Sequence, residues 1–136
     1  METLERNEWA DVAQLVEITS DAVIICELDG TILHVNNRLL DLMCEERADV
    51  IGGDVKDVLY SSAFERATEH RLPFVTDGSE SELMLKLSDG SFIPVLVCAG
   101  SVTPPRIFGR RAPRVLVALH SIEEQYSHDR QLKRAL

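Results

Sequence analysis

Histidine and cysteine, the residues that most often carry chemistry, form no metal-binding or catalytic pattern in this sequence of 136 residues. His34 alternates with Leu33 and Val35 and is expected to face solvent. The sequence also lacks a glycine-rich phosphate loop and a nucleophile-elbow motif. We therefore predict no metal site and no enzymatic activity. The histidines, which lack the short regular spacing of zinc ligands, are His34, His70, His120 and His128.

The cysteines are interpreted as structural residues. Cys26 and Cys98 fall within apolar segments, where a thiol usually acts as a small buried hydrophobic group. Cys44 is the third, and none of the three belongs to a CxxC pair. Their odd number and this spacing favour neither a disulfide nor a redox role.

Composition narrows the range of partners and locations. A formal net charge of −9 argues against nucleic acid, because binding to the phosphate backbone depends on Lys and Arg. A hydrophobic content of 45% and a charged content of 27% are typical of one globular domain. No apolar run approaches the roughly 20 residues of a membrane helix, and residues 1–18 do not resemble a signal peptide. We expect a cytoplasmic chain without nucleic-acid or membrane partners.

The elements that must position any site begin with two strands, predicted at Ala22–Leu28 and Ile32–Val35. Asp29 and Gly30 lie between them and favour a tight hairpin turn, because Gly accepts a positive φ. Asn36 follows as a predicted N-cap for a short helix. The apolar face of that helix is formed by Leu39, Leu40, Leu42 and Met43.

The rest of the central region reads as short helices followed by three strands. A longer helix is predicted over Ser62–Arg71, with Phe64 facing inward and Pro73 ending the helix. Pro94, within an apolar run, suggests an edge or a local irregularity. The other predicted elements are helical turns at 45–51 and 54–59 and strands at Glu80–Leu87, Phe92–Val102 and Arg114–Ser121.

Both ends of the chain have helical patterns. Residues 3–18 read as an amphipathic helix, and residues 122–136 read as a more polar helix. We predict three parts: an amphipathic helix at 1–18, a central domain at 19–121 and a polar helix at 122–136. The apolar stripe of the first helix must cover either the sheet of its own domain or a second copy. If it meets a second copy, the residues expected to support dimerisation are Leu4, Trp9, Val12, Val16, Val23 and Ile25.

In their order and spacing, these segments resemble the Per-Arnt-Sim (PAS) family of sensor domains. The hairpin, Asn36 and the short helix resemble the family's opening, and residues 51–55 (Ile-Gly-Gly-Asp-Val) resemble its step between helices. Residues 83–95 resemble its central hairpin, and residues 115–124 its last strand and outgoing linker. The resemblance covers roughly residues 19–125.

This resemblance implies an α+β fold. The expected sheet has five antiparallel strands in the order 2-1-5-4-3, with short helices on one face and a leading and a trailing helix. It also implies a homodimer that relays a signal through the trailing helix to a kinase, cyclase, phosphatase or transcription regulator.

Two departures from the family pattern concern signalling and cofactors. Ser121-Ile122-Glu123 replaces the Asp-Ile-Thr that usually begins the linker, which leaves His120 and Ser121 as candidates for the missing contact. Cys44 lies outside any flavin-adduct signature, and Met43-Cys44 replaces the usual Gly-Tyr.

Haem-binding relatives use a histidine near His70, but Glu69 and Arg71 beside it favour a surface position. Haem is therefore the less favoured alternative.

Three alternatives remain open: a sensor that binds an apolar ligand such as a fatty acid, a ligand-free docking or dimerisation module, and the haem sensor. If the core holds a ligand, we expect an aliphatic lining without buried charge. The predicted lining residues are Ile24, Cys26, Leu39, Leu42, Met43, Val55, Val58, Phe64, Met84, Val95, Val97, Val117 and Leu119.

Overall fold

The β1–β2 hairpin is built on the predicted Asp-Gly turn. In this computed structural model, which describes residues 17, 19, 21–68, 71–102 and 113–122, β1 (Ala22–Glu27) pairs with β2 (Ile32–Val35). Gly30 has a φ of +100°, and a Cβ there would lie 2.7 Å from Oδ1 of Asp54. The left-handed backbone therefore favours glycine at this position, and an added Cβ would also displace the Asp54 carboxylate.

Asn36 joins the hairpin to helix α2 (Asn37–Met43) and is completely buried. Its Oδ1 accepts hydrogen bonds from the backbone N–H groups of Leu39 (3.1 Å) and Val23 (3.0 Å). Its Nδ2 donates to the carbonyl of Asp21 at 2.9 Å. The predicted N-cap is thus confirmed, and the same side chain ties the helix to β1.

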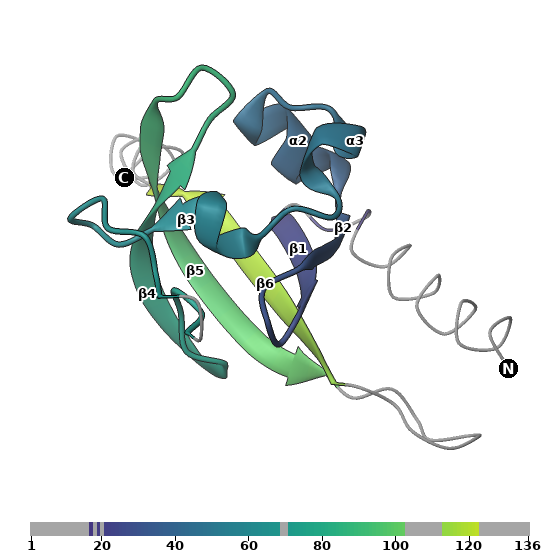
Figure 1. The fold of residues 1–136 in the computed structure, drawn as a ribbon, viewed down its shortest axis with the longest axis vertical. Helices are drawn as coiled ribbons and strands as arrows, with labels where there is room; N and C mark the ends of the chain where they lie inside the picture. The colour runs from purple at the N-terminus through teal and green to yellow at the C-terminus, as the bar shows by residue number, and fades with distance from the viewer. Residues whose placement is uncertain (1–16, 18, 20, 69–70, 103–112, 123–136) are drawn as a thin grey trace, which may run out of the picture.

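Short elements connect this part to the rest of the sheet. They are α3 (Arg47–Val50), the 3-10 turn η1 (Val55–Asp57) and β3 (Leu59–Tyr60). Three long strands follow: β4 (Asp77–Lys86), β5 (Phe92–Val102) and β6 (Arg114–Ser121). Figure 1 shows α2, α3 and η1 on one side of the curved sheet.

The sheet has six antiparallel strands in the order β2-β1-β6-β5-β4-β3. The predicted order of five strands is recovered as β2-β1-β6-β5-β4. The two-residue strand β3 is an addition at the edge, because Leu59 and Tyr60 pair with Leu85 and Met84. A strand this short gives no alternation, so the sequence pattern assigned Leu59 to a helical turn.

Pro94 sits within β5 without disturbing the sheet. It faces Met84 of β4, while pairing with β6 begins one residue later, at Val95 opposite Ser121. On the β6 side, no ladder partner is therefore lost at Pro94. The irregularity predicted at Pro94 is thus the point beyond which β5 no longer pairs with β6.

The predicted helix over Ser62–Arg71 is wrong for the residues that the structure describes there. Residues 62–68 and 71 form turns and irregular backbone. Phe64 has a φ of +63°, which is incompatible with a right-handed helix. Its N–H donates to the Ser61 carbonyl at 2.8 Å, and Ser61 Oγ accepts from the N–H of Glu65 at 3.1 Å. The Ser61 turn thus satisfies backbone groups without a helix.

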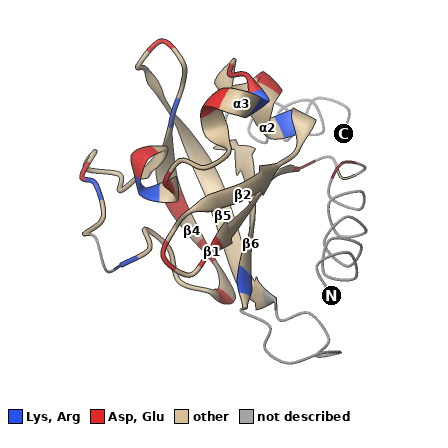
Figure 2. Cartoon of the chain, turned by 45° about the vertical axis from the view of Figure 1, so that its right-hand side comes forward, with Lys and Arg blue, Asp and Glu red and all other residues tan. Residues whose placement is uncertain are grey.

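Charged residues lie mainly away from the middle of the sheet. Figure 2 shows Asp and Glu on turns and on α3, while β5 contains no charged residue and β6 contains only Arg114. Within the described part of the chain, no helix has the length and hydrophobicity needed to cross a membrane.

Candidate functional site

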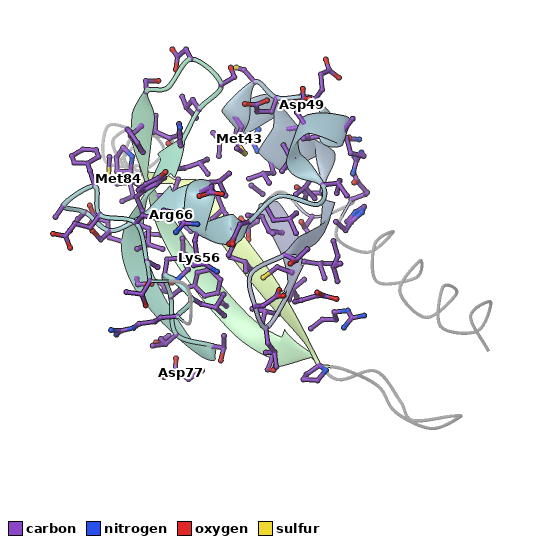
Figure 3. All side chains as sticks on the ribbon, in the orientation of Figure 1. Met43, Asp49, Lys56, Arg66, Asp77 and Met84 are labelled. Carbon is purple, nitrogen blue, oxygen red and sulfur yellow. The ribbon has the colours of Figure 1, made fainter. Side chains whose placement is uncertain are left out.

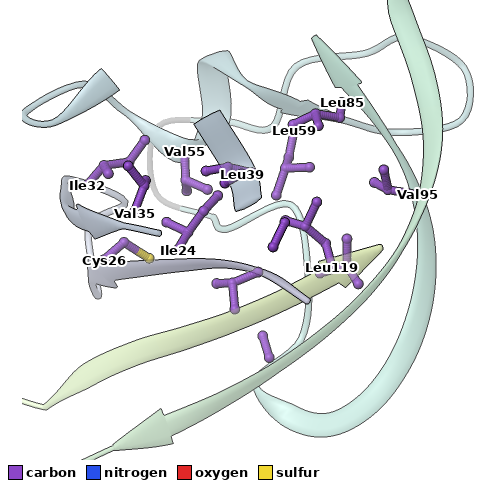
Figure 4. Packing of buried hydrophobic residues seen from close by; sticks show 14 of the residues in the cluster. Ile24, Cys26, Ile32, Val35, Leu39, Val55, Leu59, Leu85, Val95 and Leu119 are labelled. Atoms are coloured by element: carbon purple, nitrogen blue, oxygen red, sulfur yellow. The ribbon is translucent and has the colours of Figure 1, made fainter. Parts of the chain in front are cut away.

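Most of the predicted pocket residues meet in the main hydrophobic core, between the sheet and the short helices. Figure 4 shows part of this cluster, including Ile24, Cys26, Leu39 and Leu119. Burial raises the pKa of the Cys26 thiol to about 12, so Cys26 is an uncharged apolar group there. The predicted residues that are at most 2% exposed are Ile24, Cys26, Leu39, Met43, Val55, Val95, Val97, Val117 and Leu119.

Four predicted pocket residues lie elsewhere or at the margin. Leu42 and Val58 are partly buried against the core cluster. Phe64 is 56% exposed, because the expected helix is replaced by a turn. Met84 lies on the opposite sheet face from Leu83 and Leu85, which point into the core. Figure 3 shows Met43 beneath α2 and Met84 at the outer margin beside β4. Neither Phe64 nor Met84 can line the core.

A buried lysine accompanies this core and was not expected. Lys56 is only 3% exposed, and its Nζ lies 3.1 Å from Oδ2 of Asp54 and donates to the Asp29 carbonyl at 2.8 Å. These contacts fasten η1 to the β1–β2 turn. The sequence pattern does not predict the burial of Lys56, because a lysine in a polar Asp-Val-Lys-Asp run is expected to be exposed to solvent.

A cavity of about 400 Å³ lies between Ser81 of β4 and the described residues of the segment 61–75. None of the predicted pocket residues lines it. Its lining combines two guanidinium groups, hydroxyls and an apolar wall, and includes Ser61, Arg66, Arg71, Leu72, Phe74 and Ser81. Sequence reasoning missed it because the segment was assigned to a helix packed on the core.

The two arginines of this cavity differ in their partners. Arg66 Nε donates to Oδ1 of Asp57 at 2.7 Å, and this hydrogen bond raises the pKa of Arg66. The Arg71 side chain is exposed and makes no ion pair or hydrogen bond with the described residues. Its backbone N–H donates to the Thr68 carbonyl at 3.1 Å. Among the described residues that line the cavity, one guanidinium is therefore already paired with a carboxylate and one is available.

The outer face of the sheet carries a second candidate surface. We call it the outer strip, and its residues are Val23, Ile25, Leu96, Leu116 and Ala118. Ala118 lies between Val23 and Cys98, and Leu116 lies between Ile25 and Gly100. Val23 and Ile25 are buried, and the other members of the strip are half-buried. Cys98 is exposed beside the strip, against the expectation of burial, because Val97 and Ala99 occupy the inward positions.

Glu17 binds a polar cluster at the β2 edge. Its Oε1 lies 3.5 Å from Nη2 of Arg47 and 3.6 Å from Nε2 of His34, and its Oε2 accepts from the N–H of Asn37 at 3.2 Å. Arg47 also donates to the Val35 carbonyl and, at 2.7 Å, to Oδ1 of Asn37.

His34 in this cluster is half-buried rather than solvent-facing as expected, and it lies opposite Ile25 in the hairpin. Burial and then the nearby Arg47 charge lower the pKa of His34, and Glu17 opposes the shift.

Some predicted positions lie outside the described residues. These are His70, considered for haem, and the dimerisation residues Leu4, Trp9, Val12 and Val16. The expected helices at 3–18 and 122–136 also fall largely outside the described ranges and stay predictions. Within the described ranges, no group of three or more His, Cys, Asp or Glu residues could hold a metal ion.

Comparison with known proteins gives matches at the level of structure. No protein-family model matches the sequence, and no curated protein gives a significant match. The PAS domain of an HTR-like protein from Haloarcula marismortui superposes with a TM-score of 0.64 at 20% identity, covering 89% of this chain and 97% of that chain.

Two further PAS domains are similar. One, from Desulfitobacterium hafniense, has a TM-score of 0.63 at 14% identity, covering 80% of this chain and 99% of that chain. The other, from a two-component sensor histidine kinase, has a TM-score of 0.62 at 12% identity, with coverages of 86% and 98%. Strand order, the helices on one face and these superpositions agree, and the chain therefore has the fold of a PAS domain.

Proposed function

We propose that this chain is a sensory PAS module of a signal-transduction protein, and that it works by pairing with a second copy through the outer strip. The similarity to the PAS domain of a sensor histidine kinase supports a signalling role with an effector domain. The proposal assigns no catalytic residue to the chain.

The observation that carries the pairing proposal is the composition of the outer sheet face. A sheet face directed to water normally carries polar residues, yet β5 and β6 present the partly exposed Leu96, Leu116 and Ala118 there. The buried Val23 and Ile25 of β1 lie beside them on the same face. Leu96, Leu116 and Ala118 keep part of their surface exposed. Association would remove that apolar area from water.

A second copy is the occupant that best fits the charge of this strip. In a two-fold pair the same surface faces itself, so charged residues would meet their own kind. The strip itself has no charged side chain, and its margin carries Glu80 and Glu82 on β4 and His120 opposite Leu96 on β6. An uncharged strip with charges at its margin avoids repulsion at the centre of the contact.

The packed core favours this mode of action over ligand binding in the core. Nine of the thirteen predicted lining residues are at most 2% exposed, and their side chains pack against one another in the core. A fatty acid would have to displace them. We therefore propose that the core itself supports the sheet rather than holding an acyl chain.

The pairing is tested by sedimentation equilibrium of the full chain and of two variants, Leu116→Glu and Leu96→Glu. Each introduces a charge at the strip and should raise the dimer dissociation constant at least about 30-fold. Leu28→Glu is the matched control, because Leu28 is 55% exposed in the β1–β2 turn, away from the strip. Circular dichroism checks that each variant folds.

The proposal fails if the unaltered chain is monomeric at micromolar concentration. It also fails if both strip variants fold and remain dimeric. A thermal-shift screen with fatty acids tests the core separately, and a shift that is lost in a core variant such as Val117→Phe would restore the acyl-ligand alternative.

A further inference from the structure

The cavity next to the segment 61–75 is a candidate binding site that is separate from both the core and the outer strip. Its volume of about 400 Å³ is in the range of small-molecule sites. Ser81 borders it from β4 and shares a sheet face with Leu83 and Leu85, which is the face opposite the outer strip. A ligand here would not compete with pairing of two copies.

The charged groups among the described lining residues favour an anion with a single negative charge. Arg71 supplies a guanidinium that has no ion-pair partner among the described residues. Arg66 is already neutralised by Asp57, and the carboxylate of Glu65 also borders the cavity. A second negative charge on the ligand would therefore meet Glu65 or a guanidinium that is already paired. Carboxylates fit a free guanidinium well, because the two groups form parallel hydrogen bonds.

The uncharged part of the lining indicates the rest of the ligand. Ser81 Oγ is a buried atom without a hydrogen-bond partner in the described part of the chain. Buried hydroxyls are normally satisfied, so this atom is a ready partner for a polar group of a ligand. Leu72 and Phe74 supply an apolar wall beside it.

An adjoining cavity helps to orient such a ligand. Arg71, Leu72 and Phe74 also border this second space, whose lining includes Asp77 and Leu28. Hydrogen bonds from Ser79 lower the pKa of Asp77, which keeps its carboxylate ionised. A ligand carboxylate is repelled from that side and is favoured on the side of Ser81.

We propose that the cavity lined by Ser81, Arg71 and Leu72 binds a small monocarboxylate with an apolar body. Arg71 binds the carboxylate, and Ser81 Oγ hydrogen-bonds to the same group. The apolar body packs on Leu72 and Phe74. This goes beyond the pairing function, since it assigns a chemical class of ligand to a different face of the domain.

Isothermal titration calorimetry of the full chain with hexanoate tests the proposal. We expect saturable binding to one site, and at least about tenfold weaker binding of the neutral analogue hexanamide. Arg71→Gln should weaken hexanoate binding at least about tenfold, whereas Ser81→Ala should weaken it a few-fold. Lys86→Gln is the matched control, because it also removes one positive charge but lies outside the cavity lining and should leave affinity unchanged.

Several outcomes would overturn the site. They are the absence of binding at millimolar hexanoate, equal affinity for hexanamide, and undiminished binding to a folded Arg71→Gln variant. Binding of succinate as tight as that of hexanoate would refute the preference for a single charge. Sedimentation of the same samples reports pairing independently, so loss of the carboxylate site and loss of the pairing function are distinguishable.

Discussion

The packed half of the domain, built from β1, β2, α2 and β6, differs sharply from the segment 61–75. In the packed half, inward residues such as Ile24, Leu39 and Val117 are completely buried, and Asn36 joins strand to helix by three hydrogen bonds. The described residues of the segment 61–75 have turns, an exposed Phe64 and a cavity beside them, and Phe74 alone among them joins the buried core cluster.

This difference indicates that the two regions have different roles. Stability comes from the packed half, since buried apolar area is the main favourable contribution to folding. The segment 61–75 leaves polar groups and space available, which is what a binding site needs and a core avoids. Substitutions in each region test this division.

The largest expected effect is that of Leu39→Ala in α2. Leu39 is 0% exposed, so its truncation should lower the free energy of unfolding by about 3 kcal/mol through lost burial and an unfilled cavity. Leu72→Ala is the matched change in the other region. Leu72 is only partly buried and borders an existing cavity, so its truncation should cost about 1 kcal/mol or less.

Urea denaturation of the two variants measures this contrast. A common m-value would show that the surface exposed on unfolding is unchanged, so that midpoints can be compared directly. Equal losses of stability in Leu39→Ala and Leu72→Ala would contradict the division, because Leu72 would then contribute as much packing as a completely buried core residue.

A smaller effect is expected for Phe64→Gly, which tests the turn directly. Glycine relieves the left-handed backbone at φ +63°, a gain of about 1 kcal/mol. The variant loses the edge-to-face contact with Phe92, whose ring centroid lies 5.2 Å away and which contributes about 0.5–1.5 kcal/mol. The free energy of unfolding should thus stay within about 0.5 kcal/mol of the original.

If Phe64 lay on the inward-facing helix expected from the sequence, the same variant would lose far more stability. Removing a buried Phe costs about 3 kcal/mol or more, and glycine in a helix adds about 1 kcal/mol. A loss of that size on thermal or urea unfolding would contradict the exposed turn. Phe64→Ala is the control, since alanine removes the ring contact without relieving the backbone.

The two regions also differ in how far the sequence could predict their structure. The Asp29-Gly30 turn, the Asn36 cap and the order of the five main strands were predictable, because each depends on local backbone chemistry or on alternation along one strand. The burial of most core residues on the strands was predictable from the same alternation. Met84 was misassigned although Leu83 and Leu85 on either side of it define the inward face.

The segment 61–75 and its cavity were not predictable in this way. A run such as Phe64-Glu65-Arg66-Ala67 contains good helix formers, but its conformation is set by the Ser61 turn and the Asp57–Arg66 contact. Such contacts depend on how distant segments meet. The burial of Lys56 and the cluster around Glu17 are hidden from the sequence for the same reason.

The smallest expected effect concerns pH and His34, at the edge of the packed half. Burial and Arg47 hold the pKa of His34 below its ordinary value of 6.5, so the unfolded chain binds this proton more tightly than the folded chain does. The stability linked to His34 is therefore complete above that ordinary value and is lost as the pH falls below it. In His34→Gln this loss should be absent, which unfolding free energies at about pH 7.5 and about pH 5.5 would reveal.

The comparison of the two proteins isolates His34 from other titrating groups. The remaining histidines are present in both, and their contribution cancels in the difference. Asp29, Asp77 and Asp89 have pKa values held below 3.8 by hydrogen bonds, so their effect begins at lower pH. If acidification instead stabilised the original chain relative to His34→Gln, attraction to Glu17 would outweigh burial and Arg47. Glu17 would then hold a protonated His34, and the β2 edge would tighten rather than loosen in acid.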